Sequence, residues 1–182
     1  MTGREIIVGV TGGIAAYKTA MLVSQLVQNG AGITVVMTKA AEQFVGQATF
    51  AALTGRPVAT KIFDEAHYPL GAHIQLAENK DLLIVAPASA DFLAKAASGQ
   101  ADDLLTTLYL AFSGPVLMAP AMNTAMWEKP AVQRNVAQLR SDGVQFVEPE
   151  SGWLSCRQVG AGRMAAPEAI VAAVAALLRP QA

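Results

Sequence analysis

The sequence predicts an α/β protein with one open parallel sheet and helices on both faces. Short apolar runs rich in β-branched residues alternate with longer segments of helical periodicity, and the connections between them are short. Most of these runs are continuously apolar rather than alternating with polar residues, which is typical of strands buried on both faces. We therefore expect a three-layer, Rossmann-like (flavodoxin-like) open parallel sheet that occupies residues 1–182 as a single domain.

The first half of the chain holds three predicted strands and two predicted helices. In chain order these are the strand Glu5–Val10, the helix Ile14–Asn29, the strand Ile33–Met37, the helix Ala40–Leu53 and the strand Asp81–Ala86. Gly30 stands where a C-cap glycine belongs, and Thr54-Gly55 closes the second helix. Pro87 is expected to end the third strand, because proline has no backbone N–H for the ladder.

The second half continues the alternation. Its predicted elements are the helices Phe92–Ser98 and Asp103–Phe112, the strand Pro115–Ala119, the helix Ala131–Ser141, the strand Val144–Val147 and the helix Pro167–Leu178. Gly99 separates the first two helices, and Pro120 is expected to end the strand Pro115–Ala119. The segment Glu150–Arg163 is rich in glycine and has little periodicity, so it is expected to be a loop or flap.

Composition and charge exclude several classes of protein. Hydrophobic residues make up 53% of the chain and charged residues only 15%, against about 25% charged residues in an ordinary soluble domain. A disordered chain needs the opposite balance. The 13 basic and 14 acidic residues give a net charge of −1 without a basic stripe, so no nucleic-acid partner is expected. The apolar runs are too short to cross a bilayer, and no secretory signal is visible, so we expect a cytoplasmic protein.

The sparse charge and the single cysteine raise two further questions. A surface with so few charges leaves open what else covers it, and by itself it only hints at an oligomer. Cys156 cannot form an internal disulfide, and taken alone it is better explained as a small core residue than as a residue with a chemical role. With His67 and His73 as the two histidines, the sequence has no zinc-type cluster, and no metal is expected.

The loop after the first predicted strand is a candidate anion site. Ligands of open parallel sheets bind beyond the carboxyl ends of the strands. There, Gly12 and Gly13 precede a helix start, whose unpaired N–H groups attract phosphate, although a plain tight turn would use the same glycines. The G-x-G-x-x-G spacing is absent, and the second strand leads into Thr38 and Lys39 rather than an acidic residue. A dinucleotide is therefore disfavoured, but Lys39 leaves NADP open.

Unusual residues also follow the later strands. Ser89, in Pro87-Ala88-Ser89-Ala90-Asp91, offers a hydroxyl to a phosphate, or it is an ordinary helix N-cap. Asn123 lies between two methionines and ahead of Trp127, where it could bind a carboxylate or amide, or form an Asx turn. His73 lies ahead of a predicted strand and, taken alone, fits a capping or core histidine.

Six segments together resemble the flavin-containing cysteine decarboxylases, a homo-oligomeric family. They occur in the family's order, and they are G-G-I-A-A-Y-K (12–18), H-I-Q-L-A (73–77), P-A-S-A-D (87–91), A-D-D-L-L-T (101–106), P-A-M-N-T-A-M-W (120–127) and G-W-L-S-C-R-Q-V-G-A-G-R-M (152–164). The resemblance covers essentially the whole chain. The fifth and sixth blocks are specific to the family, whereas the Gly-Gly turn is not.

The resemblance implies an FMN enzyme that decarboxylates 4′-phospho-N-pantothenoyl-L-cysteine to 4′-phosphopantetheine in coenzyme A biosynthesis. In that family the flavin oxidises the thiol end of the substrate to a thioaldehyde, which can accept the electrons that carbon dioxide leaves behind. The reduced flavin and a proton donor then convert the enethiolate to the saturated thiol. The resemblance also implies a homotrimer, or a dodecamer of trimers, with flavin sites at subunit contacts. Its pathway partner would be phosphopantothenoylcysteine synthetase, to which this domain is fused in many bacteria.

The resemblance assigns roles to particular residues. The expected cofactor-binding residues are Gly12, Gly13, Ile14, Ala15, Thr38, Ala88, Ser89, Ala90, Met118 and Ala121. The expected catalytic residues are His73 as the base at the thiol end, Asn123 as the holder of the substrate carboxylate, and Cys156 as the proton donor on a closing flap. The expected substrate-binding residues are Asn123, Met122, Gly162, Arg163 and Met164. Asp91 departs from the family's usual asparagine, so no role is assigned to it.

Three alternatives share the expected fold. A peptidyl-cysteine decarboxylase of lantibiotic maturation stops at the enethiol and has no need of Cys156, and a flavin prenyltransferase has no use for the P-A-M-N block. A non-enzymatic regulatory flavoprotein of the phosphatase-inhibitor type is the third alternative, and such proteins carry long acidic tails. The two specific blocks favour the substrate-reducing decarboxylase.

Overall fold

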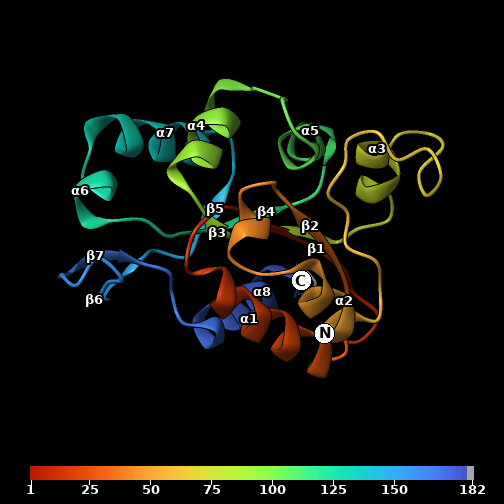
Figure 1. Cartoon of the computed structure of the whole chain (residues 1–182), viewed down its shortest axis with the longest axis horizontal. Helices are drawn as coiled ribbons and strands as arrows, with labels where there is room; N and C mark the ends of the chain where they lie inside the picture. The colour runs from red at the N-terminus through yellow and green to blue at the C-terminus, as the bar shows by residue number, and fades with distance from the viewer. Residues whose placement is uncertain (180–182) are drawn as a thin grey trace.

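The computed structural model describes residues 1–179 and contains the predicted parallel sheet. Its five strands are β1 (Glu5–Val10), β2 (Gly32–Met37), β3 (Leu82–Ala88), β4 (Val116–Pro120) and β5 (Gln145–Phe146). They are hydrogen-bonded in the order β2-β1-β3-β4-β5, and every pair is parallel. The chain therefore builds the sheet outward from β1 in both directions, and the order reverses between β1 and β3 (Figure 1).

Helices cover both faces of the sheet, so the three-layer prediction is confirmed (Figure 1). The helices are α1 (Ala16–Gln28), a short 3-10 helix (Ala41–Gln43), α2 (Gln47–Thr54), α3 (Ala72–Ala77), α4 (Ala90–Ser98), α5 (Leu104–Ala111), α6 (Thr124–Trp127), α7 (Pro130–Ser141) and α8 (Pro167–Leu177). Helices α1, α2 and α8 pack on one face, where Leu22, Phe50 and Ile170 are fully buried. Helices α3, α4, α5 and α7 cover the other face, where Leu93 and Leu108 are buried.

The strands are buried on both sides because each face of the sheet has its own apolar core. Ile6, Val8 and Val10 of β1 pack toward α1 and α8, whereas Ile7 packs into the opposite core. Every residue of β3 is buried. Continuously apolar strands with β-branched side chains are what this two-sided burial requires, which is why the strands were the most readable part of the sequence.

Of the two prolines that were expected to end strands, Pro87 lies inside its strand and Pro120 is the last residue of its strand. β3 continues through Pro87 to Ala88, and β4 ends on Pro120 itself. The pairing of β3 with β4 is irregular between Val85 and Ala88 and resumes where Ala88 lies opposite Pro120. A missing N–H thus interrupts the ladder without ending the extended backbone. The prediction that Pro87 stops the strand is therefore wrong.

Several boundaries differ from the sequence prediction for local reasons. The expected helix Ala40–Leu53 is two helices, because Gly46 adopts an extended conformation (φ −74°, ψ 149°) between the 3-10 helix and α2. His73 lies ahead of β3 as expected, but within the unpredicted helix α3, and Gly71 precedes that helix with a φ of 100°. Helix α6 was not predicted. Helices of six and four residues, as α3 and α6 are, give too little periodicity to read.

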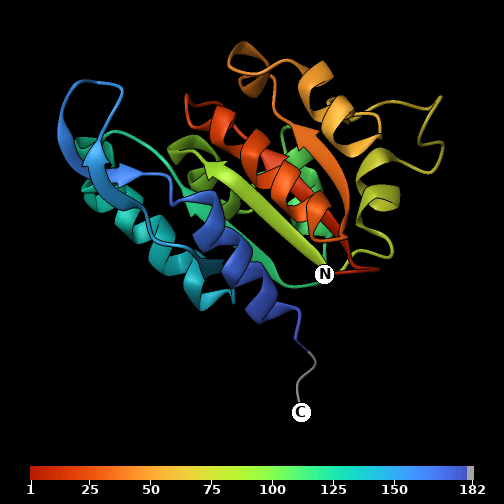
Figure 2. The ribbon, with the colours of Figure 1, turned by 90° about the horizontal axis from the view of Figure 1, so that it is seen from below.

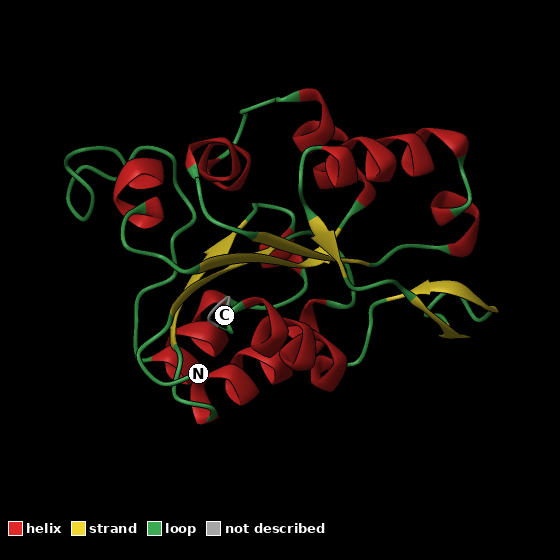
Figure 3. Cartoon of the chain, turned by 180° about the vertical axis from the view of Figure 1, so that it is seen from behind, coloured by secondary structure: helices red, strands yellow, loops and turns green. Residues whose placement is uncertain are grey.

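The segment expected to be an irregular loop or flap is an antiparallel β-hairpin. Its strands are β6 (Glu150–Trp153) and β7 (Val159–Arg163), and we call them together with their turn the β6–β7 hairpin. It projects from one end of the sheet beside α6 (Figures 2 and 3). The hairpin contributes little to either core, so its sequence carries no hydrophobic alternation that would have marked the strands.

Candidate active site

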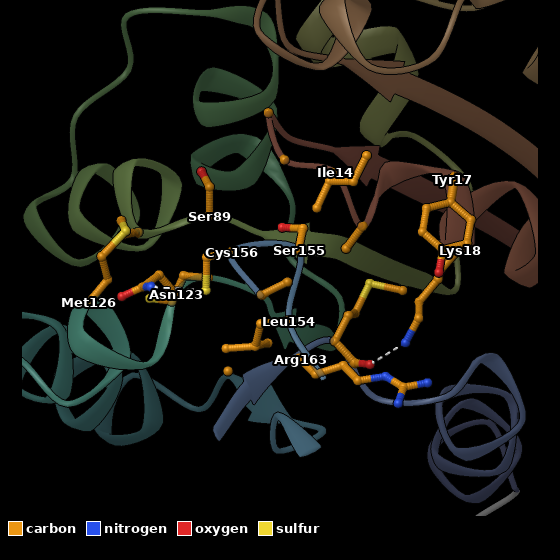
Figure 4. Close-up of a pocket in the computed structure, with 18 of the residues that line it drawn as sticks. Ile14, Tyr17, Lys18, Ser89, Asn123, Met126, Leu154, Ser155, Cys156 and Arg163 are labelled. Atoms are coloured by element: carbon orange, nitrogen blue, oxygen red, sulfur yellow. Dashed lines mark hydrogen bonds between the residues drawn. The ribbon is translucent and has the colours of Figure 1, made fainter. Parts of the chain in front are cut away.

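A pocket of about 570 Å³ opens at the carboxyl edge of the sheet, between the strand-end loops and the β6–β7 hairpin (Figure 4). Thirteen of the residues predicted from the sequence line it: Gly12, Gly13, Ile14, Ala15, Ser89, Ala90, Ala121, Met122, Asn123, Cys156, Gly162, Arg163 and Met164. They come from four segments that are far apart in the sequence. The fold thus brings most of the predicted cofactor and substrate residues to one cavity.

The loop between β1 and α1 presents a row of unpaired backbone donors to this pocket. Within residues 1–179, the amides of Gly12, Gly13, Ile14 and Ala15 have no backbone or side-chain acceptor, and the first bonded amide is that of Ala16. No side chain caps α1. Consecutive free amides at a helix N-terminus attract an anion both by hydrogen bonding and through the helix dipole. The loop therefore has free donors that could bind an anion, and the binding of a phosphate there stays a prediction.

Thr11 holds this loop against the end of β3. Its buried hydroxyl donates to the carbonyl oxygen of Pro87 at 2.6 Å and accepts from the amide of Ser89 at 3.0 Å. The Ser89 hydroxyl accepts from the amide of Phe92 at 3.2 Å, so Ser89 is the N-cap of α4 and also lines the pocket. Both interpretations of Ser89 are therefore compatible, and Thr11 is a positioning residue that sequence reasoning missed.

Three predicted cofactor residues lie next to the pocket rather than on its wall. Ala88 and Met118 are fully buried in the core beneath it. Thr38 follows β2 and donates its amide to the carbonyl oxygen of Val10, so it lies beside the start of the free-amide loop. The Asp91 side chain forms an ion pair with Lys95 at 3.2 Å and does not line the pocket. Any contact of Thr38, Ala88 and Met118 with a cofactor remains a prediction.

Asn123 and Cys156 meet at one end of the pocket. Nδ2 of Asn123 lies 3.4 Å from the Cys156 sulfur, to which it donates, and Oδ1 accepts from the amide of Ala125 at 2.8 Å. The second bond makes Asn123 the N-cap of α6, so the Asx turn that was the alternative to a binding role is present. It also orients the amide so that the NH₂ group faces the pocket and the sulfur (Figure 4). Cys156 is exposed, not a core residue.

Two hydrogen bonds to carbonyl oxygens of the β6–β7 hairpin hold it against the loop that carries Asn123. The amide of Met122 donates to the carbonyl oxygen of Gly162 at 2.9 Å, and the Thr124 hydroxyl donates to the carbonyl oxygen of Ala161 at 2.7 Å. Gly162 has a φ of 120°, and a Cβ there would collide with the Met122 carbonyl oxygen; one at Gly160 would collide with the Thr124 side chain. The two glycines therefore permit the approach that puts Cys156 beside Asn123.

Lys18 was not predicted as a site residue, yet it lines the pocket. Its side chain is buried, and Nζ donates to the carbonyl oxygen of Met164 at 2.8 Å (Figure 4). Burial lowers the pKa of the Lys18 ammonium group, the positive charge of Arg163 lowers it further, and the carboxylates of Glu150 and Glu168 oppose this. Lys18 is the last residue of the G-G-I-A-A-Y-K motif, which could have pointed to it. Helical periodicity alone, however, predicts that a lysine at this position faces solvent.

His73 is not part of this pocket. It lies on α3, at the end of the molecule away from α6 and the β6–β7 hairpin (Figures 1 and 3). Its Nδ1 is buried without a hydrogen-bond partner in residues 1–179. The three predicted catalytic residues therefore do not meet within one chain. His73 is the residue that lies apart, and its buried ring nitrogen has no hydrogen-bond partner in the described residues.

Residues 1–179 contain neither a metal-type cluster of side chains nor a membrane-spanning helix. No group of three or more His, Cys, Asp and Glu side chains there could hold a metal ion. Across the same residues, each helix is too short or too polar to traverse a lipid bilayer.

Comparison with known proteins matches the chain to the family model described as Flavoprotein over residues 1–179. The coenzyme A biosynthesis bifunctional protein CoaBC of Bacillus subtilis is 47% identical over 171 residues, which are 94% of this chain and 42% of that protein. The chain thus spans less than half the length of such curated relatives.

Two solved structures extend the comparison. The FMN-dependent cysteine decarboxylase SpaF is 36% identical with a TM-score of 0.77, covering 95% of this chain and 98% of that one. A cysteine-to-serine variant of a PPC decarboxylase, complexed with pantothenoylaminoethenethiol, is 28% identical with a TM-score of 0.84, covering 95% and 97% of the two chains. Both similarities extend over nearly the full length of each chain.

Proposed function

The chain belongs to the flavoprotein family, and from this premise we propose that it decarboxylates 4′-phospho-N-pantothenoyl-L-cysteine to 4′-phosphopantetheine with FMN, a step of coenzyme A biosynthesis. One observation carries the proposal: the Asn123 amide and the Cys156 thiol are in contact in a pocket that is also lined by the loop with four free amides. This arrangement pairs a carboxylate-binding group with a proton donor next to a phosphate site.

The pocket fits FMN at its phosphate. The amides of Gly12, Gly13, Ile14 and Ala15 would donate to the phosphate oxygens, with the hydroxyls of Thr38 and Ser89 nearby. Ala90 and Ala121, small residues at strand ends, would leave room for a flat ring over Ala88 and Met118. Bound FMN would supply the two-electron oxidation and the later reduction, and the chain's residues would orient and protonate the substrate.

Asn123 and Cys156 would act on the cysteine end of the substrate. The NH₂ group of Asn123 would hold the carboxylate in a largely apolar pocket, where a charge-assisted hydrogen bond is stronger than in water. After carbon dioxide leaves, the Cys156 thiol would give its proton to the carbon of the enethiolate. The β6–β7 hairpin, which carries Cys156, would exclude water from that end of the pocket.

His73 would enter the site of a second copy of the chain. Large apolar side chains are exposed on and just before α3, among them Phe63, Leu70 and Ile74, and others are exposed at the pocket, among them Ile14, Tyr17 and Trp153. Two different apolar patches on one chain favour a head-to-tail contact, which closes into a ring when the rotation allows it. A homotrimer, or a dodecamer of trimers, would bring the orphaned His73 ring to the neighbour's thiol site.

The relatives extend the proposal to the pathway. Because the curated relatives are bifunctional coenzyme A biosynthesis proteins, the expected partner activity is phosphopantothenoylcysteine synthetase, in the same protein or a separate one. We propose that residues 1–182 form the flavin-dependent decarboxylase domain and that it works in the cytoplasm.

The test is turnover by the wild type and by Cys156→Ser. The wild type is expected to be yellow with bound FMN, to release carbon dioxide from 4′-phosphopantothenoylcysteine and to yield phosphopantetheine. The variant is expected to decarboxylate but to accumulate an enethiol product and reduced flavin. A wild type that itself stops at the enethiol would instead favour an oxidative peptidyl-cysteine type, a possibility that the 36% identity to SpaF makes worth measuring. A protein that cannot be loaded with FMN would refute the proposal.

A further inference from the structure

Three consecutive residues that lead into α6 each donate one hydrogen bond to the β6–β7 hairpin. Met122 donates its backbone amide, Asn123 its side-chain NH₂ group and Thr124 its hydroxyl. The acceptors, in the same order, are the carbonyl oxygen of Gly162 at 2.9 Å, the sulfur of Cys156 at 3.4 Å and the carbonyl oxygen of Ala161 at 2.7 Å. The Met122 bond comes from the backbone, and the Asn123 amide already has a proposed role in substrate binding. The Thr124 hydroxyl makes the remaining bond, and the proposed function gives it no role.

The Thr124 side chain fits a gap in β7. A Cβ at Gly160 would collide with the Thr124 hydroxyl, so the glycine leaves the space that this side chain fills. Thr124 is half-buried and does not line the pocket, whereas its neighbours Met122 and Asn123 do. Thr124 would therefore affect a ligand in the pocket only through the position of the hairpin, whose turn carries Cys156.

Few other contacts hold the hairpin to the rest of the described residues. It contributes little to either core, and Trp153 and Val159, which are paired across its two strands, are 64% and 75% exposed. At its base, Glu150 accepts a hydrogen bond from the Ala166 amide at 2.9 Å. A segment with few buried apolar contacts opens locally at a low cost in free energy. One hydrogen bond is therefore a large share of what keeps this hairpin closed.

We propose that Thr124 is a positioning residue that keeps the β6–β7 hairpin closed while Cys156 protonates the enethiolate. The inference rests on the proposed function, in which oxidation of the substrate and loss of carbon dioxide precede this proton transfer. If the hairpin opens first, the enethiol leaves unreduced, and dissolved dioxygen takes up the two electrons and two protons left on the flavin and becomes hydrogen peroxide. The ratio of enethiol to phosphopantetheine should then follow the opening equilibrium of the hairpin, to which the Thr124 bond contributes.

The experiment measures the ratio of enethiol to phosphopantetheine that the FMN-loaded protein forms in air. Thr124→Val removes the donor and keeps the shape of the side chain. It should raise the ratio by about 2- to 10-fold, which is the effect of one lost hydrogen bond on an equilibrium. Hydrogen peroxide should rise in step with the enethiol, and Thr124→Ser, which keeps the hydroxyl, should keep the ratio of the wild type. An unchanged ratio in Thr124→Val would overturn the inference.

Thr107→Val is the matched control. The Thr107 hydroxyl also donates to a carbonyl oxygen at 2.7 Å, that of Asp103, and Thr107 is likewise half-buried and outside the pocket. This variant should lose stability and keep the product ratio, and a ratio that rises as much as in Thr124→Val would refute a specific role of Thr124. Gly160→Ala disturbs the same contact from the hairpin, because its Cβ displaces the Thr124 hydroxyl, and it should also raise the ratio. It keeps the test usable if Thr124→Val does not fold.

Hydrogen exchange tests the closing role without any measurement of activity. Because the Met122 amide is bonded to Gly162 of the hairpin, exchange in a peptide that spans residues 120–127 of the FMN-loaded protein should be faster in Thr124→Val than in the wild type. Equal exchange would refute the inference and leave the proposed function standing. A wild type that forms only enethiol, or that leaves the substrate intact, would refute the proposed function, and hydrogen exchange would still decide whether Thr124 holds the hairpin closed.

Discussion

The amino and carboxyl edges of the sheet, where the strands begin and end, differ in how their polar groups are paired. At the amino edge, Glu5 accepts two hydrogen bonds from Arg56 (2.6 and 2.8 Å) and one from Lys80 (3.0 Å). Next to it, Asp81 pairs with Arg4 at 2.7 Å. At the carboxyl edge of the same strand, the backbone amides of residues 12–15 have no hydrogen-bond acceptor within residues 1–179. Paired charges stabilise the fold, whereas unpaired donors are left for ligands, so substitutions at the two edges should affect different measurements.

The largest effect on activity is expected from Asn123→Asp. The new carboxylate would face the substrate's own carboxylate in an apolar pocket, where like charges repel strongly. We expect kcat/KM to fall by at least about 100-fold, in line with the cost of disrupting a buried charge-assisted contact. The melting temperature should change little, because Asp can cap α6 as Asn does. Asn135→Asp, on α7 outside the pocket, is the control, and equal kinetics for the two variants would remove Asn123 from the site.

A second prediction concerns how the β6–β7 hairpin docks. Gly162→Ala places a Cβ against the Met122 carbonyl oxygen at a φ of 120°, so we expect the hairpin to shift and to move Cys156 away from Asn123. A displacement of this kind should reduce turnover by about 10- to 100-fold. Gly143→Ala is matched to it, because Gly143 also has a positive φ (91°) but has open space around it and lies after α7. That control should lose stability through backbone strain and keep its activity; if both variants keep activity, hairpin docking does not position Cys156.

Features with a local sequence pattern could be predicted from the sequence, whereas features that depend on distant contacts could not. The strands were predicted because two-sided burial imposes continuous apolar runs, and the Gly12–Gly13 loop was predicted because helix-start chemistry is local. The hairpin was missed as a hairpin, since its strands depend on contacts with the Met122–Thr124 loop rather than on their own pattern. Lys18 was missed because only the distant Met164 carbonyl reveals that it is buried. The family resemblance identified His73 as a candidate catalytic residue. No sequence pattern could show that His73 lies outside the pocket of its own chain.

Thr11→Val is expected to affect both the stability of the fold and the binding of FMN. It removes the hydroxyl that joins the Pro87 carbonyl and the Ser89 amide, and it leaves both buried groups without that partner. The cost to the free energy of unfolding should be about 1–3 kcal/mol. Because the same hydroxyl places Ser89 and the free-amide loop, FMN retention should weaken as well. Thr19→Val is the comparison, since the Thr19 hydroxyl donates to Ala86 farther from the pocket. Stability loss in both variants with FMN loss only in Thr11→Val would support the positioning role, and equal FMN retention would contradict it.

The smallest expected effect belongs to the amino edge, and it depends on pH. The hydrogen bonds from Arg56 lower the pKa of Glu5 from 4.5 to about 2, with Lys80 adding to the effect. A depressed folded-state pKa adds stability that is fully present above the unfolded value and is lost as the pH falls from about 4.5 toward 2. Because the Glu5 side chain is 34% exposed, solvent screening reduces this contribution to about 1 kcal/mol. Glu5→Gln should therefore lower the free energy of unfolding by that amount at pH 7 and flatten its decline below pH 4.5, while the bound flavin and the turnover stay unchanged. A Glu5→Gln variant that loses FMN would show that the two edges are coupled through β1. It would contradict the expectation that substitutions at the two edges affect different measurements.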